Sequence, residues 1–574
     1  MATSQQRYAE QIAGSHQTAG FDVLPDEEFV HASYRDGSYD LFVNGERLTD
    51  VEGDLTKPSW LDGRRTVLAL LDHDGTEQHD LIEVDPDTGS IDPILEDDHQ
   101  IINPIPNPTD SDVLGFLSTS DGSIDLYTFR IGDPDSVRRR SAVDDLVNGF
   151  DWAPDGDQLV YQTRMIEGSA LRVVDLDAGT DEVLIDEPGS EQALTLYFGT
   201  GEGAWTDNGI VFTTNHVTGY RELAVANAAG EFDLRYSNGR DKFDARWGPD
   251  GDVLFTEARD GNFLLRQFDG TDATTVEPSG VVSYIRVANE FTYYLRHGPE
   301  TPGEIYRDST RIFEEPFEPT TVAPEPITYE SFDGMEIPAR LYMPSGDPDG
   351  AVVLAHGGPE ALHINWINER AQILVNAGYE VLTPDVRGSV GYGRAFRKES
   401  DGDLGGGDLR DIEAAAKYLQ GRGHDAVGVA GLSYGGYMTM MAVGATDAFD
   451  AGVSVAGIVN WKTAVEKARG YLGDYTFRKF GGTPEELPEL YEERSPITYV
   501  DEISVPLLVV QGANDPRVVE NEADQLVESL SDRDVPFEYL LFDDEGHVIL
   551  HRENRIEYLT EMVSFFDTHL RQDE

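Results

Sequence analysis

The sequence predicts two large domains, an N-terminal all-β propeller of about seven blades and a C-terminal α/β domain with a mainly parallel sheet. Three observations predict this architecture. Short β-like segments recur before about residue 320, strands and helices alternate after it, and 574 residues are too many for one hydrophobic core. We place an N-terminal helix at 1–22, packed on the C-terminal domain, the propeller at 23–322 and the C-terminal domain at 323–574.

Apolar segments rich in Val, Leu, Phe and Tyr repeat through the N-terminal half and are separated by Asp-Gly and Asn-Gly turns. They begin at Val30, Val67, Val113, Leu159, Ile210, Val253 and Phe291. This spacing is roughly the 40 to 50 residues of a propeller blade. A tryptophan precedes four of these segments, at Trp60, Trp152, Trp205 and Trp247. A radial repeat explains the pattern best, and a β-sandwich or solenoid is the alternative.

A proline-rich connector at 316–326 separates the β-rich N-terminal part of the sequence from the C-terminal part. Beyond it, short apolar strands alternate with helical stretches. The strands are expected at 351–355, 379–383, 426–430 and 506–510, and two of the helices at 409–419 and 523–530. This alternation is typical of a parallel sheet with helices on both faces.

The chain is strongly acidic, with 108 Asp and Glu against 43 Lys and Arg and a formal charge of -65. The acids are spread along the chain, so they form neither a tail nor a disordered block. We expect an acidic surface over an ordinary fold. Molar salt would screen its self-repulsion within about 3 Å, which predicts a salt-loving source. A merely soluble acidic protein is the alternative. Nucleic acid is excluded as a partner by charge repulsion.

Several protein classes are excluded by what the sequence lacks. No apolar run reaches the roughly 18 residues of a membrane span, so no membrane partner is expected. The N-terminus lacks the pattern of a secretory signal, and we predict a cytoplasmic protein. The absence of cysteine excludes disulfides, a thiol nucleophile and Cys-ligated metals. We predict no metal site and no cofactor.

Ser433 lies in a Gly-x-Ser-x-Gly motif at 431–435, directly after the strand expected at 426–430 and before a helical stretch. A strand-to-helix elbow holds such a serine in a strained turn, and the flanking glycines let the backbone pass closely. This placement predicts the nucleophile of an α/β-hydrolase domain.

A serine nucleophile needs a base and an acid, which in this fold follow in the order Ser, Asp or Glu, His. Asp515 follows the strand expected at 506–510, and His547 follows a strand-like segment at 537–542. Both residues therefore stand where the ends of parallel strands would bring them beside Ser433. We predict Asp515 as the acid and His547 as the base.

Other residues compete for these roles. Asp543 and Asp544 are closer to His547 in sequence, but they are its loop neighbours rather than the end of a preceding strand. His551 is the nearest rival base, but no glycine turn precedes it. For Asp515 the alternative is a solvated surface carboxylate.

Acyl transfer also needs hydrogen-bond donors for the developing oxyanion, and losing one costs about 3 kcal/mol. The backbone N–H of Tyr434 is one candidate. Gly358, in the His-Gly-Gly-Pro segment at 356–359, is the second, because this segment follows a strand end as oxyanion loops do. The alternative is a plain tight turn.

At these residues the C-terminal half resembles the prolyl oligopeptidase family of serine peptidases, and its acylaminoacyl-peptidase branch most closely. The motifs that carry the resemblance lie at 356–359, 386–393, 405–411, 431–437, 514–518, 545–547 and 553–554. The detailed resemblance covers residues 326–574.

The resemblance implies an enzyme that hydrolyses short peptides or N-acylated peptides through an acyl-enzyme on Ser433, beneath a seven-bladed propeller. It also implies that Arg517, two residues after Asp515, binds a substrate carbonyl. The alternative for Arg517 is pairing with one of the many surface acids. A short peptide is the expected partner, and self-association is left open.

Three other functions are left open. A carboxylesterase or other acyl hydrolase would use the same triad. A dipeptidyl peptidase would need a pair of propeller glutamates that cannot be identified among so many acids. A propeller scaffold on an inactive hydrolase is the third. Trp461, Tyr471 and Tyr475 stand where the resemblance implies a specificity pocket, or they belong to the core.

Overall fold

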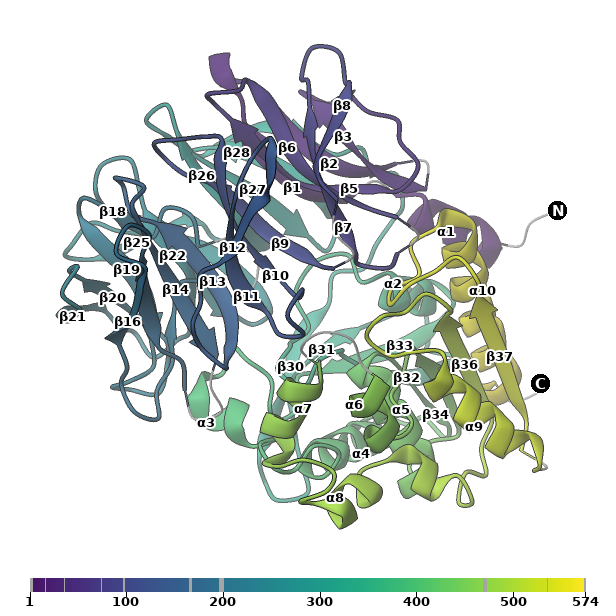
Figure 1. The fold of residues 1–574 in the computed structure, drawn as a ribbon. Helices are drawn as coiled ribbons and strands as arrows, with labels where there is room; N and C mark the ends of the chain where they lie inside the picture. The colour runs from purple at the N-terminus through teal and green to yellow at the C-terminus, as the bar shows by residue number, and fades with distance from the viewer. Residues whose placement is uncertain are drawn as a thin grey trace.

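The computed structural model describes residues 4–571 apart from residues 16, 36, 74, 97–98, 165–167, 196–200, 468–471 and 534. Figure 1 shows two lobes, with the β-rich N-terminal domain at the upper left and the α/β domain at the lower right. Both predicted fold classes are confirmed.

In the described part of the chain, the strands of the N-terminal domain form seven successive groups of four antiparallel strands, which we call blades, and a parallel bridge between Phe263 and Val281 joins the sixth and seventh blades into one sheet. The blades are, in order, β1 (Gln17–Val23), β2 (Phe29–Arg35), β3 (Ser38–Val43) and β4 (Glu46–Arg47); β5 (Asp54–Leu61), β6 (Thr66–Asp72), β7 (His79–Val84) and β8 (Ile91–Leu95); β9 (Ile101–Pro106), β10 (Val113–Ser118), β11 (Asp125–Arg130) and β12 (Asp133–Arg139); β13 (Leu146–Trp152), β14 (Gln158–Arg164), β15 (Leu171–Asp175) and β16 (Thr180–Ile185); β17 (Gln192–Ala193), β19 (Gly209–Thr214), β20 (Glu222–Ala226) and β21 (Phe232–Tyr236), with the short β18 (Trp205–Thr206) also paired to β19; β22 (Lys242–Trp247), β23 (Val253–Arg259), β24 (Asn262–Phe268) and β25 (Ala273–Glu277); and β26 (Val281–Ala288), β27 (Phe291–Gly298), β28 (Thr301–Arg307) and β29 (Thr310–Glu314). Each of the seven predicted apolar segments is the second strand of one blade.

The first strands of neighbouring blades lie side by side and are joined by hydrogen bonds. Asp22 in β1 accepts from the backbone N–H of Trp60 in β5 at 2.7 Å. Asp151 in β13 accepts in the same way from Trp205 in β18 at 2.8 Å. Among the described residues, the first strand of six blades also carries a bulge or register shift. Bulges bend and twist a strand, which fits strands that converge on a common axis.

The ring closes by side-chain packing between the first and last blades. Phe21 and Phe29 share an apolar cluster with Tyr293 and Leu295. In the described part of the chain, the strands of the two blades belong to separate sheets and no backbone ladder joins them. An ion pair also links the blades, from Arg286 Nε to Asp22 Oδ1 at 3.2 Å. Closure therefore depends on side chains, both apolar and charged.

The N-terminal helix α1 (Ser4–Ala13) packs on the α/β domain, where Tyr8 and Ile12 join its apolar core. Figure 1 shows α1 beside the C-terminal helix. The prediction of a helix over 1–22 is wrong at its C-terminal end, because Gln17–Val23 is the first strand of the first blade. Gly14 and Gly20 disfavour a helix there, while β-branched and aromatic residues favour a strand.

The α/β domain contains one eight-stranded sheet in the order β30-β31-β33-β32-β34-β35-β36-β37. Its strands are β30 (Glu325–Glu330), β31 (Glu336–Tyr342), β32 (Gly350–Ala355), β33 (Tyr379–Pro384), β34 (Val427–Leu432), β35 (Ala451–Val455), β36 (Leu507–Gly512) and β37 (Phe537–Phe542). The strands from β33 to β37 pair in parallel, and β30 and β31 are antiparallel. The carboxyl ends of the parallel strands therefore meet at one edge.

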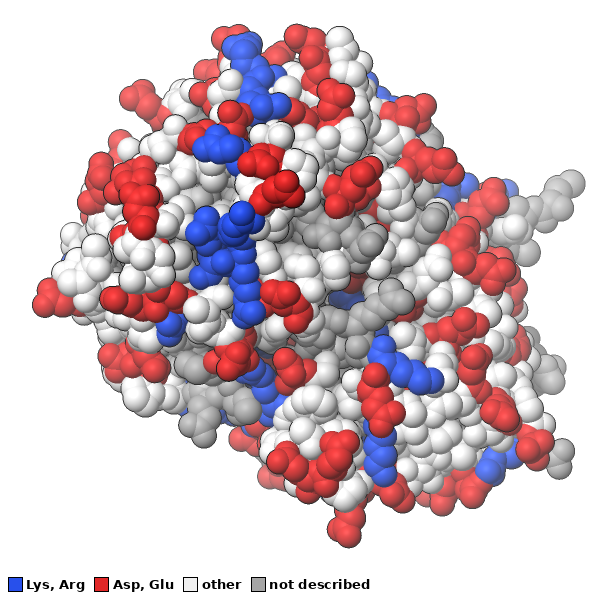
Figure 2. Space-filling view, viewed as in Figure 1, with Lys and Arg blue, Asp and Glu red and all other residues white. Residues whose placement is uncertain are grey.

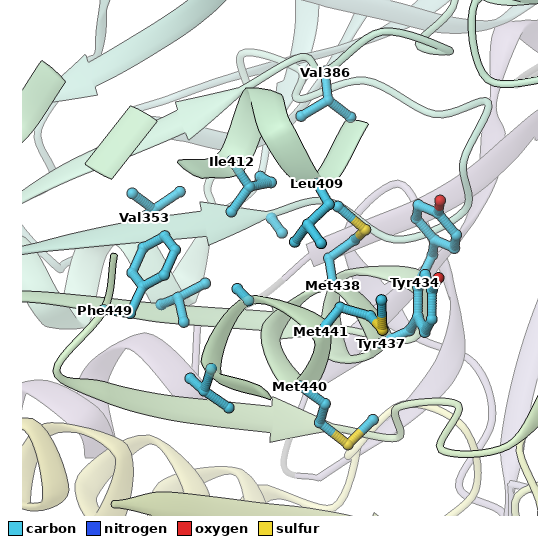
Figure 3. Packing of buried hydrophobic residues seen from close by; sticks show 14 of the residues in the cluster. Val353, Val386, Leu409, Ile412, Tyr434, Tyr437, Met438, Met440, Met441 and Phe449 are labelled. Atoms are coloured by element: carbon cyan, nitrogen blue, oxygen red, sulfur yellow. The ribbon is translucent and has the colours of Figure 1, made fainter. Parts of the chain in front are cut away.

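Helices cover both faces of this sheet. They are α2 (Glu369–Asn376), α3 (Gly393–Lys398), α4 (Gly407–Gly421), α5 (Tyr434–Ala445), α6 (Trp461–Lys467), α7 (Leu472–Phe480), α8 (Pro488–Glu493), α9 (Asn521–Ser531) and α10 (Arg552–Leu570). Figure 3 shows how α5 is held: Met438 and Met441 lie among side chains of α4, and Val353 of β32 belongs to the same cluster. The helix that follows Ser433 is therefore embedded in the core. Among the described residues, no helix is both long and apolar enough to span a membrane.

The propeller contacts the carboxyl edge of the sheet. Gly75, between β6 and β7, lies so close to Gly546 that a Cβ on Gly546 would be 1.9 Å from the Gly75 carbonyl oxygen. The backbone N–H of Gly393 donates to Asp241 Oδ2 at 2.8 Å. The loops after the parallel strands are thus covered by the other domain. Figure 2 shows acidic side chains scattered over both domains on the face drawn.

Replacing Phe21, which is fully buried in the seam between the first and last blades, should weaken propeller closure. We expect Phe21→Ala to cost about 3–5 kcal/mol, as truncation of a buried Phe does, and to lower the first calorimetric unfolding transition. Val183, 53% exposed on the propeller, provides the control: Val183→Ala should leave that transition unchanged. Equal temperatures of the first unfolding transition in Phe21→Ala and Val183→Ala would contradict a role of Phe21 in closing the propeller.

Candidate active site

Ser433 lies in a sharp turn between β34 and α5, with φ 60° and ψ -119°. The left-handed φ is strained for a residue with a Cβ and is typical of a nucleophile elbow. Glycine is required on either side. A Cβ on Gly431 would be 2.4 Å from the Gly435 backbone, and a Cβ on Gly435 would be 2.3 Å from the Ala355 carbonyl oxygen. The motif is therefore a packing requirement of the turn.

His547 and Asp515 lie in contact at the same edge of the sheet. His547 Nδ1 is 2.8 Å from Asp515 Oδ2, and both side chains are about 95% buried. The other carboxylate oxygen, Oδ1, accepts from the backbone N–H groups of Arg517 and Val518 at 2.8 and 2.9 Å. These donors fix the carboxylate, so that Oδ2 holds the proton on Nδ1 and leaves Nε2 as the acceptor.

The loop that carries His547 is organised around Glu545, whose side chain is buried. Its carboxylate accepts from the backbone N–H groups of Leu550 and His551 at 2.8 and 2.9 Å and from Asn554 Nδ2 at 2.8 Å. From the sequence, Glu545 was only part of a motif at 545–547, with no predicted role.

The rival base, His551, is engaged elsewhere. Its Nδ1 lies 3.3 Å from Glu545 Oε1, and this carboxylate raises the pKa of His551 to about 9, so that the ring is protonated at neutral pH and cannot accept a proton. In the described part of the chain, no hydrogen bond or ion pair joins His547 to the rival acids Asp543 and Asp544, whereas Asp515 bonds to it. The structure brings together the predicted acid and base.

The His-Gly-Gly-Pro segment runs past the elbow. A Cβ on Gly357 would be 3.6 Å from Ser433 Cβ, so this backbone lies against the serine. Gly358 has φ 55°, a conformation that favours glycine. Tyr434 is the first residue of α5, where a backbone N–H has no acceptor within the helix. Both predicted oxyanion donors line one cavity with Ser433.

This cavity lies between the domains and has a volume of about 600 Å³. One part of its wall is apolar and includes Ile458, Trp461, Leu472 and Tyr475. Two of the three aromatic residues expected at a specificity pocket, Trp461 and Tyr475, therefore face it, although Trp461 is also 97% buried. Tyr471 lies outside the described residues.

Arg517 also lines the cavity and is paired with the propeller. Its Nε lies 2.8 Å from Oε1 and 2.9 Å from Oε2 of Glu77. From the sequence, Arg517 had two possible roles, a substrate ligand or an ion-pair partner of a surface acid. The structure contains the ion pair and leaves the side chain 48% exposed at the cavity.

Five further charged residues line the cavity and were missed in the sequence analysis: Arg164, Glu191, Arg221, Glu360 and Arg397. Among 108 acids, no sequence signal distinguishes Glu191. Glu360 did have one, because it directly follows the His-Gly-Gly-Pro segment.

These features suit acyl transfer. An elbow serine, a buried His–Asp pair and two backbone N–H groups, one at a helix start and one in the His-Gly-Gly-Pro loop, supply the nucleophile, the base and an oxyanion site. The described residues contain no group of three or more His, Cys, Asp or Glu that could hold a metal ion.

Comparison with known families agrees with this site. Residues 365–573 match the model of the "Prolyl oligopeptidase family" of peptidases. The match covers most of the α/β domain, which is thus similar to this family. The matched segment contains all three predicted triad residues, Ser433, Asp515 and His547.

Individual relatives extend the similarity. "Dipeptidyl aminopeptidase BIII" of Pseudoxanthomonas mexicana is 30% identical over 411 residues, which cover 66% of this chain and 58% of the relative. The "Acylamino-acid-releasing enzyme" of Rattus norvegicus is 27% identical over 252 residues, 41% of this chain and 34% of the relative. The chain thus spans less than two thirds of these curated relatives. A puromycin-hydrolyzing peptidase of Mycobacterium tuberculosis has the same fold, with a TM-score of 0.85 at 18% identity over 98% of this chain and 96% of that one.

The contacts of Asp515 predict the effect of Asp515→Asn. The two backbone N–H donors should keep the amide oxygen at the Oδ1 position, so the amide NH₂ faces His547 Nδ1 and forces the proton onto Nε2. His547 could then no longer accept the serine proton. We expect the rate of acylation of Ser433 by an activated ester to fall by about 10⁴-fold, with little change in unfolding temperature.

Asp543→Asn is the matched control, because Asp543 is an exposed acid in the neighbouring loop. Its acylation rate should stay within about twofold of the wild-type rate. A similar loss in both variants would contradict the assignment of Asp515.

Proposed function

We propose that this protein is a serine peptidase that hydrolyses short peptides or N-acylated peptides through an acyl-enzyme on Ser433. The observation that carries the proposal is the strained elbow at Ser433, combined with the hydrogen-bonded His547–Asp515 pair at the same sheet edge. A carboxylesterase or other acyl hydrolase with the same triad is the second candidate, because the triad by itself does not choose between ester and amide bonds.

In the proposed reaction, Ser433 Oγ attacks the carbonyl carbon of the scissile bond while His547 Nε2 takes the hydroxyl proton. The backbone N–H groups of Tyr434 and Gly358 donate to the oxyanion of the tetrahedral intermediate. His547 then gives its proton to the leaving amine, and the acyl group stays on Ser433. Water, deprotonated by His547, attacks the acyl-enzyme and releases the acid.

Two observations support a peptide substrate over a simple ester. The propeller covers the cavity, whose volume of about 600 Å³ suits a short chain rather than a folded protein. Two relatives are named a dipeptidyl aminopeptidase and an acylamino-acid-releasing enzyme. We propose that Arg517, held at Nε by Glu77, donates to a carbonyl of the bound peptide.

We also propose that the protein works in the cytoplasm of a salt-loving organism, as an acidic enzyme without a cofactor. The formal charge of -65 is the support for the high-salt setting. The acylaminoacyl-peptidase branch remains the proposed branch, supported by the similarity to the rat acylamino-acid-releasing enzyme.

A fluorophosphonate probe tests the nucleophile. We expect stoichiometric labelling of Ser433, no labelling of Ser433→Ala, and loss of all peptide hydrolysis in that variant. Turnover of acetyl-amino-acid anilides should be compared with turnover of simple acyl esters by the wild-type protein. Activity confined to esters would favour the acyl hydrolase, and labelling at another residue would overturn the assignment.

Salt should stabilise the fold. Because the surface charges repel one another, we expect the unfolding temperature to rise by roughly 5 °C or more between 0.1 M and 2 M KCl, as screening shortens to a few ångströms. Calorimetry measures this shift. An unfolding temperature that does not change with salt would contradict a high-salt origin.

A further inference from the structure

An alternating row of charged side chains from both domains lines the wall of the cavity. Glu191 pairs with Arg221 at 2.5 Å and with Arg397, and Glu360 pairs with Arg397 and with Arg164. We call these five residues the charge row. Arg164, Glu191 and Arg221 belong to the propeller, and Glu360 and Arg397 to the α/β domain. An arginine stands at each end.

The charge row is positive. Three guanidinium groups face two carboxylates, which leaves a net charge of +1. Behind the row, Lys479 lies 3.1 Å from Glu360 and 2.5 Å from Asp401. The charges of Lys479 and Asp401 cancel, so they leave the net charge of the row at +1. Positive charge in this cavity contrasts with the formal charge of -65 for the chain.

Both glutamates in the row are already compensated. Burial alone would raise the pKa of Glu360, but the charges of Arg164, Arg397 and Lys479 outweigh burial and hold that pKa well below its ordinary value. Burial is outweighed at Glu191 too, where Arg221 and Arg397 lower the pKa. An incoming ammonium group would therefore meet carboxylates that each bind two arginines, and it would be repelled by those arginines.

An incoming carboxylate would meet the opposite situation. Arg164, at one end of the row, keeps 36% of its side chain exposed, while Arg221 and Arg397 keep 9% and 14%. The Arg164 guanidinium carbon also lies 5.1 Å from the ring centre of Tyr475, on the apolar part of the wall. Arginine binds carboxylates through paired N–H donors, and it does so more strongly where water is excluded.

We propose that the charge row determines specificity: it selects short peptides that carry a carboxylate next to the scissile bond and rejects peptides that present a free ammonium group there. This inference rests on the proposed peptidase function and names its substrate class. The apolar part of the wall would hold the neighbouring side chain of the same peptide. Arg164 and Arg221 would determine which peptides bind, whereas Ser433 and His547 would cleave the scissile bond.

Matched peptides test the proposal. Acetylated peptides would carry Glu or its neutral isostere Gln, placed in one series on the acyl side and in another on the leaving side of the scissile bond. A further series would compare acetylated with free N-termini. For the wild-type enzyme we expect kcat/KM to be at least about tenfold higher for Glu than for Gln in one of the first two series. Free N-termini should lower kcat/KM.

Substitutions in the charge row test whether it causes the preference for Glu over Gln. Arg164→Gln and Arg221→Gln should each reduce the Glu preference to about threefold or less, and Arg164→Lys should retain part of it because the charge remains. Arg138 provides the control, since it is exposed on β12 and donates to backbone carbonyls of its own strand. Arg138→Gln should leave the preference unchanged. Unfolding temperatures show whether each variant is folded.

The outcomes separate the two proposals. Hydrolysis of acetylated peptides with equal rates for Glu and Gln would overturn the charge-row inference and leave the peptidase proposal intact. Faster hydrolysis of peptides with free N-termini would overturn it as well, and would assign Glu191 and Glu360 to ammonium binding. No hydrolysis of any peptide by protein that the phosphonate probe labels would refute the peptidase function and this inference with it.

Discussion

The parallel sheet of the α/β domain provides the constraint on which the site depends, because its strands end side by side at one edge. The loops after β32, β34, β36 and β37 are far apart in sequence but meet there. Crowding at that edge leaves no space for a Cβ on Gly431 or Gly435, and Ser433 takes a left-handed turn as a result. The same geometry lets the backbone after Asp515 fix its carboxylate, which in turn orients His547.

The cavity belongs to the interface and not to either domain. The propeller supplies Arg164, Glu191 and Arg221, the α/β domain supplies Ser433 and the oxyanion segment, and Gly75 presses against the loop of His547. Any separation of the domains would therefore alter the base, the cavity and its charges together. Among the described residues, side chains close the propeller without a shared sheet, so the blades around this interface depend on a small apolar cluster and on ion pairs such as Arg286–Asp22.

Charge has different roles outside and inside the molecule. Acidic groups at the surface are hydrated and screened, so each contributes little to any one contact. Inside the cavity, the arginines are largely buried and face carboxylates at hydrogen-bond distance, where each charge has a larger effect. A protein can thus carry a large negative charge and still present a positive wall to its substrate.

The sequence by itself determined the features that depend on local patterns. Seven apolar segments at a regular spacing predicted the blades, since each second strand is buried and flanked by turns. The elbow motif and the order of Ser433, Asp515 and His547 predicted residues that the structure places at one sheet edge, because strand ends follow directly from strand positions.

Only the tertiary structure decided which charges pair and where the ring closes. The pairs Glu77–Arg517 and Glu191–Arg397 each join segments more than 200 residues apart, and no local sequence pattern distinguishes these two glutamates from the other acids of the chain. Residues 17–22 were predicted as the end of a helix, but Gln17–Val23 forms a strand because it pairs with the strand Phe29–Arg35 in the first blade. The ion pairs and the first strand are stabilised by contacts between residues far apart in sequence. Only the folded chain brings these residues together, so local sequence patterns do not predict the contacts.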